Sequence, residues 1–149
     1  EGELWLKGPV TTPGYWENIE ATQKSFTDGW FKTGDILVRD EEGYYFVKDR
    51  IKNMFISGGE NVYPAEVERF LQTHPFIREV AVIGVSDDRW GEVGKAIVVT
   101  SGDNISAKEI LDFCDGNLAR FKIPKYVHQV EDIPKTESGK VDRKRLSKL

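Results

Sequence analysis

The chain has 149 residues, of which 39% are hydrophobic and 31% charged, as is typical of one ordinary globular domain or two small ones. Its net charge of −4 argues against general nucleic-acid binding, and no apolar run approaches the roughly 20 residues of a membrane span. The single cysteine, Cys114, excludes an internal disulfide framework and favours a cytoplasmic location. No signal peptide is apparent, although the residues from Asn104 match a glycosylation acceptor. Because the chain begins at Glu1 and its one methionine is Met54, we expect a piece of a longer protein.

The first third of the chain is rich in expected strands. We expect strands at residues 2–7, 30–39 and 44–48, a thin helical pattern at 18–26, a turn at 28–29 and a hairpin loop at 40–43. No helix in this part is strong enough to complete a core. Residues 1–51 therefore indicate part of a sheet or small barrel that belongs to a larger domain.

Residues 52–149 differ because helical and strand patterns alternate. We expect helices at 65–73 and 108–118, and strands at 79–85, 95–100 and 126–130. Ser106 and Glu109 have the spacing of a capping box before the second helix. The pattern predicts an α+β fold, in which a small C-terminal domain has a short mixed sheet flanked by helices.

The stretch at residues 49–68 lies where the two parts meet and reads DRIKNMFISGGENVYPAEVE. Its glycine pair, Gly58 and Gly59, permits a tight turn and the close approach of another group. Pro64 suits the first position of a helix, where the backbone N–H is unpaired in any case. We expect a strand, a glycine turn and an amphipathic helix, in that order.

A second candidate site is the loop that ends at Lys140, with the sequence PKTESGK. It is not a Walker loop, because Pro134 occupies the place of the first glycine and Val141 that of the serine or threonine. A lysine on a mobile, glycine-bearing loop can still place a point charge on a phosphate or carboxylate oxygen. The alternative is that Lys140 belongs to a solvated basic tail at residues 135–149.

Acidic side chains supply further candidates. Asp35 ends the sequence Thr33-Gly34-Asp35 at the entry to an apolar strand, where its carboxylate could accept both hydroxyls of a ribose; a turn aspartate is the alternative. Asp49-Arg50 offers either another polar contact or a structural ion pair. The two histidines have no cysteine or carboxylate at metal-ligand spacing, so we expect no metal site.

Four segments together resemble the AMP-forming acyl-CoA synthetases: TGD, DRIKNMFISGGENVYPAEVE, DRWGE and PKTESGK, in this order. This family belongs with the luciferases and the peptide-synthetase adenylation domains in one adenylate-forming superfamily. The resemblance covers essentially the whole chain, and SGGENVYP and FKIPKY are similar to segments of the fatty-acyl and aryl CoA ligases. In that family a large N-terminal domain binds ATP and the carboxylate, and a small C-terminal domain rotates over it.

The resemblance implies roles for the candidate side chains in the first chemical step. Asp35 would hold the ribose hydroxyls of ATP or of the acyl-adenylate, and Arg50 would support the same ribose. Lys140 would contact the carboxylate and the α-phosphate while the acyl-adenylate and pyrophosphate form. Magnesium would accompany ATP.

It also implies roles in the second step, in which CoA displaces AMP to give the thioester. Lys52 would be the hinge between the two conformations, and Gly58 and Gly59 would line the passage for the pantetheine arm of CoA. Residues 1–51 would be the tail of the large domain and residues 52–149 the mobile C-terminal domain. The partners would be the protein's own N-terminal domain, ATP, CoA and a carboxylic acid.

The family's phosphate loop and acyl pocket would lie upstream of this chain, so we expect the chain to be inactive by itself. Two alternatives are left open by these residues. One is an adenylating enzyme that loads a carrier protein instead of CoA, and the other is a non-catalytic binding module with the same fold.

Overall fold

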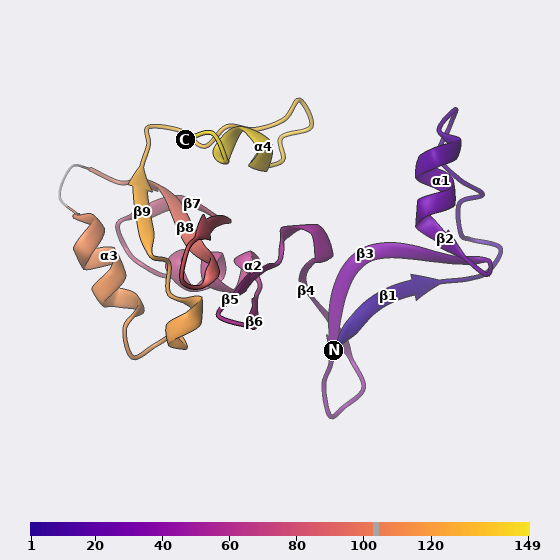
Figure 1. Cartoon of the computed structure of the whole chain (residues 1–149), viewed down its shortest axis with the longest axis horizontal. Coiled ribbons are helices and arrows are strands. Elements are labelled where there is room, and N and C mark those ends of the chain that lie inside the picture. Colours follow the sequence, from indigo (N-terminus) through magenta and orange to yellow (C-terminus); the bar gives the residue numbers. More distant parts are fainter. Residues whose placement is uncertain (103–104) are drawn as a thin grey trace. The chain divides into compact units, whose positions relative to one another are not determined.

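The computed structural model describes residues 1–102 and 105–149 and divides into two compact units, Glu1–Lys52 and Asn53–Leu149. Figure 1 shows the elements of both units along the chain. The glycosylation pattern that begins at Asn104 lies partly outside the described residues. Among the described residues, no helix combines the length and the apolar character needed to cross a membrane.

The first unit is an antiparallel sheet built around its longest strand. Its elements are β1 (Gly2–Leu6), α1 (Ile19–Ser25), β2 (Phe26–Thr27), β3 (Trp30–Arg39) and β4 (Tyr45–Arg50). β3 pairs with β1 along one side and with both β2 and β4 along the other. The helix forms where its pattern predicted it, because Asn18 caps it by accepting a hydrogen bond from the Ala21 N–H at 3.0 Å.

The sequence Thr33-Gly34-Asp35 lies inside β3, not at a strand entry as expected. The pairing of β1 with β3 shifts here, because Glu3 faces Ile36 whereas Trp5 faces Lys32. The three residues therefore bulge opposite a single residue of β1. A φ angle of +74° at Gly34 explains the glycine, since a side chain rarely adopts this conformation.

The second unit is a five-stranded mixed sheet with helices, as the sequence predicted. Its elements are β5 (Phe55–Ser57), β6 (Glu60–Val62), α2 (Pro64–Leu71), β7 (Ile77–Asp87), β8 (Gly91–Thr100), α3 (Ala107–Cys114), the 3₁₀ turn η2 (Arg120–Lys122), β9 (Tyr126–Gln129) and α4 (Arg143–Leu146). The order is β6-β5-β8-β7, and β9 pairs in parallel with β8. Another 3₁₀ turn, η1 (Ile51–Asn53), spans the boundary between the units.

Two local expectations need correction in this unit. The glycine turn leads into a second short strand, β6, before the helix begins, because three residues after the turn pair back onto β5. The helix α3 ends at Cys114 instead of continuing to residue 118. It stops because Asp115 leaves the helical region and Gly116 adopts a φ of +75°.

Both faces of the sheet are covered, and alternate residues of β7 and β8 supply the two cores. Val82 and Val98 face α2 and α3, whereas Ala81 and Ile97 face the opposite side. The capping box of α3 is present, with the Ser106 side chain accepting from the Glu109 N–H and the Glu109 carboxylate accepting from the Ser106 N–H. The hydrogen bonds that the Ser106 N–H and Oγ–H donate to the Glu109 carboxylate lower the pKa of Glu109.

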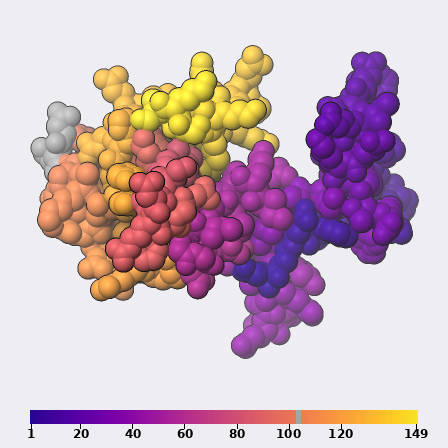
Figure 2. Space-filling view, viewed as in Figure 1, coloured from indigo at the N-terminus to yellow at the C-terminus, as the bar shows by residue number. Residues whose placement is uncertain are grey.

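The C-terminal segment is not a solvated basic tail. Ile133 and Leu146 are 1% and 0% exposed, and together with Val141 they pack on the face of the sheet opposite α2 and α3. Figure 2 shows this segment, in yellow, lying over one side of the second unit. The basic run carries apolar residues at the positions that meet the sheet, and its net charge obscured them.

Candidate functional site

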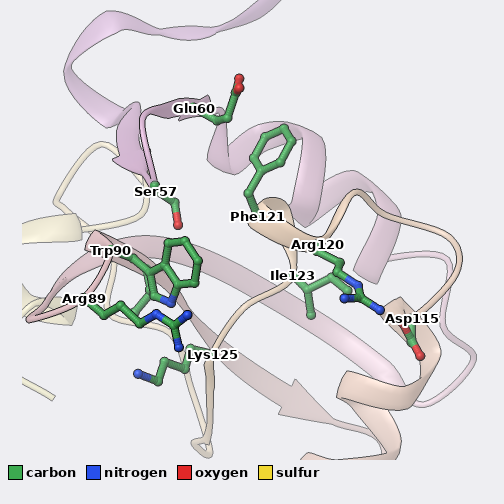
Figure 3. Close-up of a pocket in the computed structure, with 11 residues that line it drawn as sticks. Ser57, Glu60, Arg89, Trp90, Asp115, Arg120, Phe121, Ile123 and Lys125 are labelled. Atoms are coloured by element: carbon green, nitrogen blue, oxygen red, sulfur yellow. The ribbon is translucent and has the colours of Figure 1, made fainter.

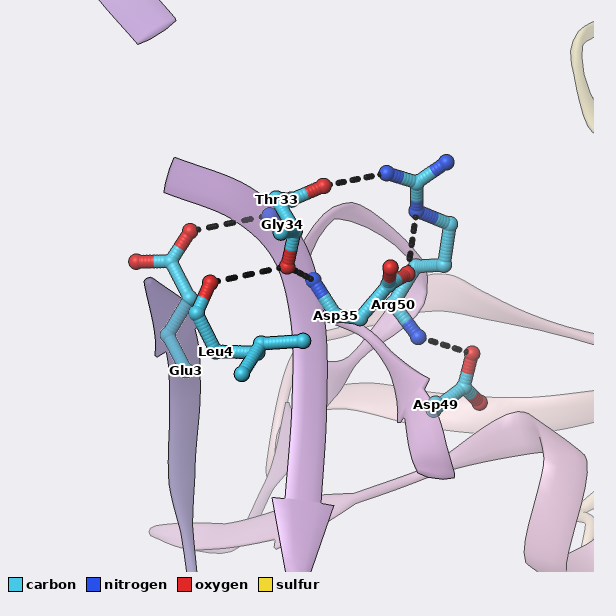
Figure 4. Close-up of polar contacts among 7 residues, drawn as sticks. All are labelled: Glu3, Leu4, Thr33, Gly34, Asp35, Asp49 and Arg50. Atoms are coloured by element: carbon cyan, nitrogen blue, oxygen red, sulfur yellow. Dashed lines mark hydrogen bonds and ion pairs between the residues drawn. The ribbon is translucent and has the colours of Figure 1, made fainter. Parts of the chain in front are cut away.

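Asp35 and Arg50 lie directly opposite each other on β3 and β4. Arg50 Nε lies 3.0 Å from Asp35 Oδ1, and Arg50 Nη2 donates to the Thr33 carbonyl oxygen (Figure 4). The two side chains are 34% and 48% exposed, so the pair can meet a ligand and adds little to stability. The bulge at Gly34 brings these groups together, because it presents the Asp35 carboxylate and the Thr33 carbonyl to one guanidinium.

Asp49 has a different role from that of Asp35. It is 6% exposed, and its Oδ1 atom accepts a hydrogen bond from the Arg50 N–H at 2.6 Å. The Arg50 side chain is ion-paired with Asp35.

Gly58 and Gly59 form the two-residue turn of the β5–β6 hairpin, and both have positive φ angles, +60° and +89°. Such turns match the twist of the flanking strands. A Cβ atom at Gly58 would lie 2.8 Å from Trp90 Cε3, whereas one at Gly59 would meet nothing within 4 Å. Gly58 is therefore required both for its backbone conformation and for the close approach of the Trp90 ring.

A pocket of about 910 Å³ opens beside this turn. It is lined by Ser57, Gly58, Glu60, Arg89, Trp90, Val93, Asp115, Arg120, Phe121, Ile123 and Lys125. Figure 3 shows Trp90, Arg89 and Lys125 gathered on one side and Arg120 beside Asp115 on the other. The Arg89 guanidinium lies 4.8 Å from the centre of the Trp90 ring, which holds the ring in place.

Sequence reasoning missed this pocket, because its walls come from three separated segments. Residues 88–90 join β7 to β8, and Gly91 and Glu92 are the first residues of β8. The signal that could have indicated the pocket is that two segments, Arg89-Trp90 and the FKIPKY segment from Phe121, both combine aromatic with basic residues. Lys125 in that segment is ion-paired with Asp87, and its hydrogen bond lowers the pKa of that carboxyl.

Lys140 lies at the end of a turn that is closed by backbone hydrogen bonds. Lys135 and Val141 form a β-bridge, and the Thr136 N–H donates to the Lys140 carbonyl oxygen at 2.7 Å. The Gly139 N–H donates to Thr136 O at 2.9 Å, with a φ of +77° at Gly139. The side chain of Lys140 is exposed, and within the described part of the chain no carboxylate is ion-paired with it.

The remaining sequence predictions are a hinge at Lys52 and the absence of a metal site. Lys52 is exposed and lies within η1, at the last residue of the first unit. In residues 1–102 and 105–149, no group of three or more histidine, cysteine or acidic side chains is arranged to hold a metal ion. His74 contacts the Phe113 ring and accepts from the Phe76 N–H.

Residues 66–140 match the family described as AMP-binding enzyme C-terminal domain. The 2-succinylbenzoate–CoA ligase of Listeria monocytogenes serotype 4b is 50% identical over 146 residues, covering 98% of this chain and 31% of the relative. The long-chain-fatty-acid–CoA ligase FadD13 of Mycobacterium tuberculosis is 48% identical, covering 95% of this chain and 28% of the relative. The chain thus spans less than a third of the length of these relatives.

Solved structures of related enzymes contain a region with the same fold as this chain. The o-succinylbenzoate CoA synthetase of Bacillus subtilis, in complex with its acyl-adenylate intermediate, matches with a TM-score of 0.90 and 41% identity, covering 97% of this chain and 30% of that one. ATP-bound MatB from Rhodopseudomonas palustris matches with a TM-score of 0.89 and 41% identity, covering 99% and 30%. All four proteins carry the matching region as a minor part of a longer chain.

Proposed function

Because the chain belongs to the family of AMP-binding enzyme C-terminal domains, we propose that it is the C-terminal part of an ATP-dependent, AMP-forming acyl-CoA ligase. A carboxylate attacks the α-phosphorus of ATP and releases pyrophosphate, and the CoA thiol then displaces AMP from the acyl-adenylate to form the thioester. The observation that carries this proposal is the identity of 48–50% over 95–98% of the chain to two CoA ligases named for different acids. The reaction class is common to both names, whereas the acid differs.

Lys140 is proposed to act in adenylation. Its ammonium is exposed at the end of a turn held by backbone hydrogen bonds, so it can approach an anionic group without first being ordered. A fixed cation directed at the carboxylate and the α-phosphate stabilises the charge that develops as the new bond forms. Magnesium would be bound with the ATP phosphates by upstream residues of the protein.

Asp35 and Arg50 are proposed to hold the ribose of the nucleotide. A carboxylate is an acceptor with two oxygens, which suits a pair of neighbouring hydroxyls. Arg50 fixes the orientation of that carboxylate through the contact of 3.0 Å. The ribose belongs to ATP before the first step and to the acyl-adenylate afterwards, so this pair would serve both steps.

The second step is assigned to the pocket beside Gly58. Three cations, Arg89, Arg120 and Lys125, line it and suit the phosphates of CoA. The pantetheine arm would pass along the turn at Gly58 and Gly59, where a missing side chain leaves backbone accessible. Against these three cations the lining carries two carboxylates, Glu60 and Asp115, so an excess of positive charge is available to an anionic ligand such as CoA.

Lys52 is proposed as the hinge that allows the second unit to present Lys140 in one step and the pocket in the other. It lies at the boundary of the two compact units, and hinges are few positions that absorb large changes of φ and ψ. The partner of the first unit is proposed to be an upstream domain of the same protein. Tyr45, Phe46 and Val47 on β4 are 58–64% exposed, an apolar surface that such a domain would bury.

The test is CoA-dependent release of AMP by the full-length protein, measured with acids of different chain length and with aryl acids. Lys140→Ala should slow acyl-adenylate formation by about a hundredfold to a thousandfold and leave thioester formation from supplied acyl-adenylate nearly intact. Lys148→Ala, which removes an exposed lysine of the same segment, is the control. Equal losses in both half-reactions would refute the role of Lys140, and AMP release that requires a carrier protein instead of CoA would refute the acceptor.

A further inference from the structure

Glu68, Val82 and Arg143 form a closed ring of hydrogen bonds in the second unit. The Val82 N–H donates to Glu68 Oε1 at 2.8 Å, and Arg143 Nη2 donates to the same oxygen at 2.8 Å. Arg143 Nη1 closes the ring by donating to the Val82 carbonyl oxygen. The side chains of Arg143 and Glu68 are 27% and 21% exposed, so the ring is largely shielded from water.

This ring lies on the outer side of β7, which is the last strand in the order of its sheet. In an antiparallel pair, alternate residues direct both backbone groups away from the partner strand. At Val82, the backbone N–H and carbonyl that could bond to a further strand are bonded to side chains instead. Glu68 accepts from the N–H, and Arg143 donates to the carbonyl oxygen. The two side chains together satisfy an open edge that would otherwise be free to pair with another chain.

The ring also joins the helix layer of the sheet to the segment that carries Lys140. Glu68 lies on α2, whereas Arg143 is the first residue of α4 and follows Lys140 by three positions. Between them, the Asp142 N–H donates to Pro134 O at 2.8 Å, which fixes the exit of the turn to its entry. A movement of Arg143 would therefore be transmitted to Lys140 through two residues that are themselves bonded.

A second contact holds the entry of the same turn more weakly. Lys135 Nζ lies 2.9 Å from Glu79 Oε2, also on β7, and this hydrogen bond raises the pKa of Lys135. These side chains are 43% and 35% exposed, so solvent screens the pair more than it screens Arg143 and Glu68. The pair of Arg143 with Glu68 is thus the better shielded of the two ion pairs that attach this segment to the rest of the unit.

We propose that Arg143 is a positioning residue for Lys140 and that it acts through Glu68 and the edge of β7 without touching the substrate. The proposal rests on the proposed role of Lys140 in adenylation. Displacement of a reacting group by about 1 Å can cost a hundredfold in rate. Arginine suits this position better than lysine, because its planar fork donates to two acceptors at once whereas lysine presents a single point charge.

The test compares half-reactions of the full-length protein. Arg143→Met should slow acyl-adenylate formation by about tenfold to a hundredfold through kcat, with the KM for ATP and the thioester half-reaction unchanged within about twofold. Arg143→Lys should restore part of the rate. Lys144→Met, which removes the exposed neighbouring cation of α4, is the matched control and should behave as the unmodified protein.

Amide hydrogen exchange gives a readout that does not depend on activity. In Arg143→Met, the Thr136 and Gly139 N–H groups should exchange about tenfold faster, because opening of the turn becomes more frequent. Exchanging the charges, with Glu68→Arg and Arg143→Glu together, should not rescue the rate, since the carboxylate would then face the Val82 carbonyl. Rescue by this double variant would show an ordinary ion pair and overturn the proposal.

Three further outcomes separate this proposal from the proposed function. If Lys140→Ala abolishes adenylation while Arg143→Met does not, the positioning role is wrong and the function stands. If Arg143→Met lowers both half-reactions in parallel with the melting temperature, Arg143 is only structural and the proposal is overturned. If Lys140→Ala leaves adenylation intact, the proposed function itself is wrong, and the positioning role falls with it.

Discussion

The two units of the chain differ in how much of their own core they contain. In residues 1–52, all of which the structure describes, Ile36 is the single buried apolar side chain. The second unit has two apolar clusters, one on each face of its sheet. A sheet that leaves its apolar side chains exposed depends on something outside itself, whereas a sheet covered on both faces does not. From this contrast we propose that the first unit is part of a larger domain and that the second is a domain in its own right.

The largest expected effect is on folding of the separated units. A fragment of residues 53–149 should unfold in one cooperative transition, with a free energy of unfolding on the order of 5 kcal/mol. A fragment of residues 1–52 should show no cooperative transition, because it buries too little apolar surface. Thermal denaturation followed by circular dichroism checks both, and neither fragment should catalyse ATP–pyrophosphate exchange. A sharp transition in the fragment of residues 1–52 would show that the first unit folds by itself and would contradict this contrast.

The boundary between the units is tested next, with Lys52→Pro in the full-length protein. Proline fixes φ near about −65° and disfavours the helical region at Ile51, so η1 cannot form as it does here. We expect adenylate formation to survive and thioester formation to fall by about a hundredfold, as for misplaced reacting groups. Lys52→Ala, which leaves both torsions free, is the control. Parallel loss of both half-reactions with a lower melting temperature would argue against a hinge.

The variant Asp35→Ala tests whether the first unit contributes both to acyl-adenylate formation and to thioester formation. Loss of a charge-assisted hydrogen bond of about 1.5–3 kcal/mol should weaken ATP affinity by roughly tenfold to a hundredfold, and both half-reactions should slow. Asp35→Asn keeps the shape and removes the charge that pairs with Arg50. Glu41→Ala, in the exposed hairpin turn of the same unit, is the control. Unchanged affinity for ATP, measured by calorimetry, would exclude the ribose contact.

Gly58→Ala tests the pocket side of the second unit. Both Gly58→Ala and Gly59→Ala should lose about 1–2 kcal/mol of stability through their positive φ angles. Gly58→Ala should also displace Trp90, because its Cβ would lie 2.8 Å from the ring, and thioester formation should fall by about tenfold. Gly59→Ala adds the same strain without the collision and serves as the control. If the two variants affect the thioester step equally, the position of the Trp90 ring does not matter for that step.

The last prediction concerns stability at high pH and the core of the second unit, and it leaves activity at neutral pH unchanged. Burial raises the pKa of the Cys114 thiol to about 11 from an ordinary value of 9.0. Folding therefore favours the protonated thiol, so its contribution is complete below pH 9 and is lost as pH rises through 11. Each unit of pKa corresponds to about 1.4 kcal/mol. Denaturant unfolding from pH 8 to 11 should show a steeper decline for the natural chain than for Cys114→Ala, and identical slopes would contradict this.

Local features could be predicted from the sequence because the residues that form them are near one another. The capping box of Ser106 and Glu109 spans three residues, and the alternation along β7 and β8 is visible within each strand. The mixed sheet with helices follows from these patterns. The candidate site residues followed from short motifs and family resemblance, which name residues without showing what holds them.

The tertiary structure alone decided which distant groups meet. Asp35 meets Arg50 because the register of β3 with β4 places them opposite each other, and Glu68 meets Arg143 across 75 positions because both reach the open edge of β7. The charge of the C-terminal run predicted solvent, yet Leu146 is fully buried since the second face of the sheet needed covering. Sequence patterns record the periodicity of one element at a time. Contacts between elements depend on how sheet edges and faces are completed, and only the folded chain determines that.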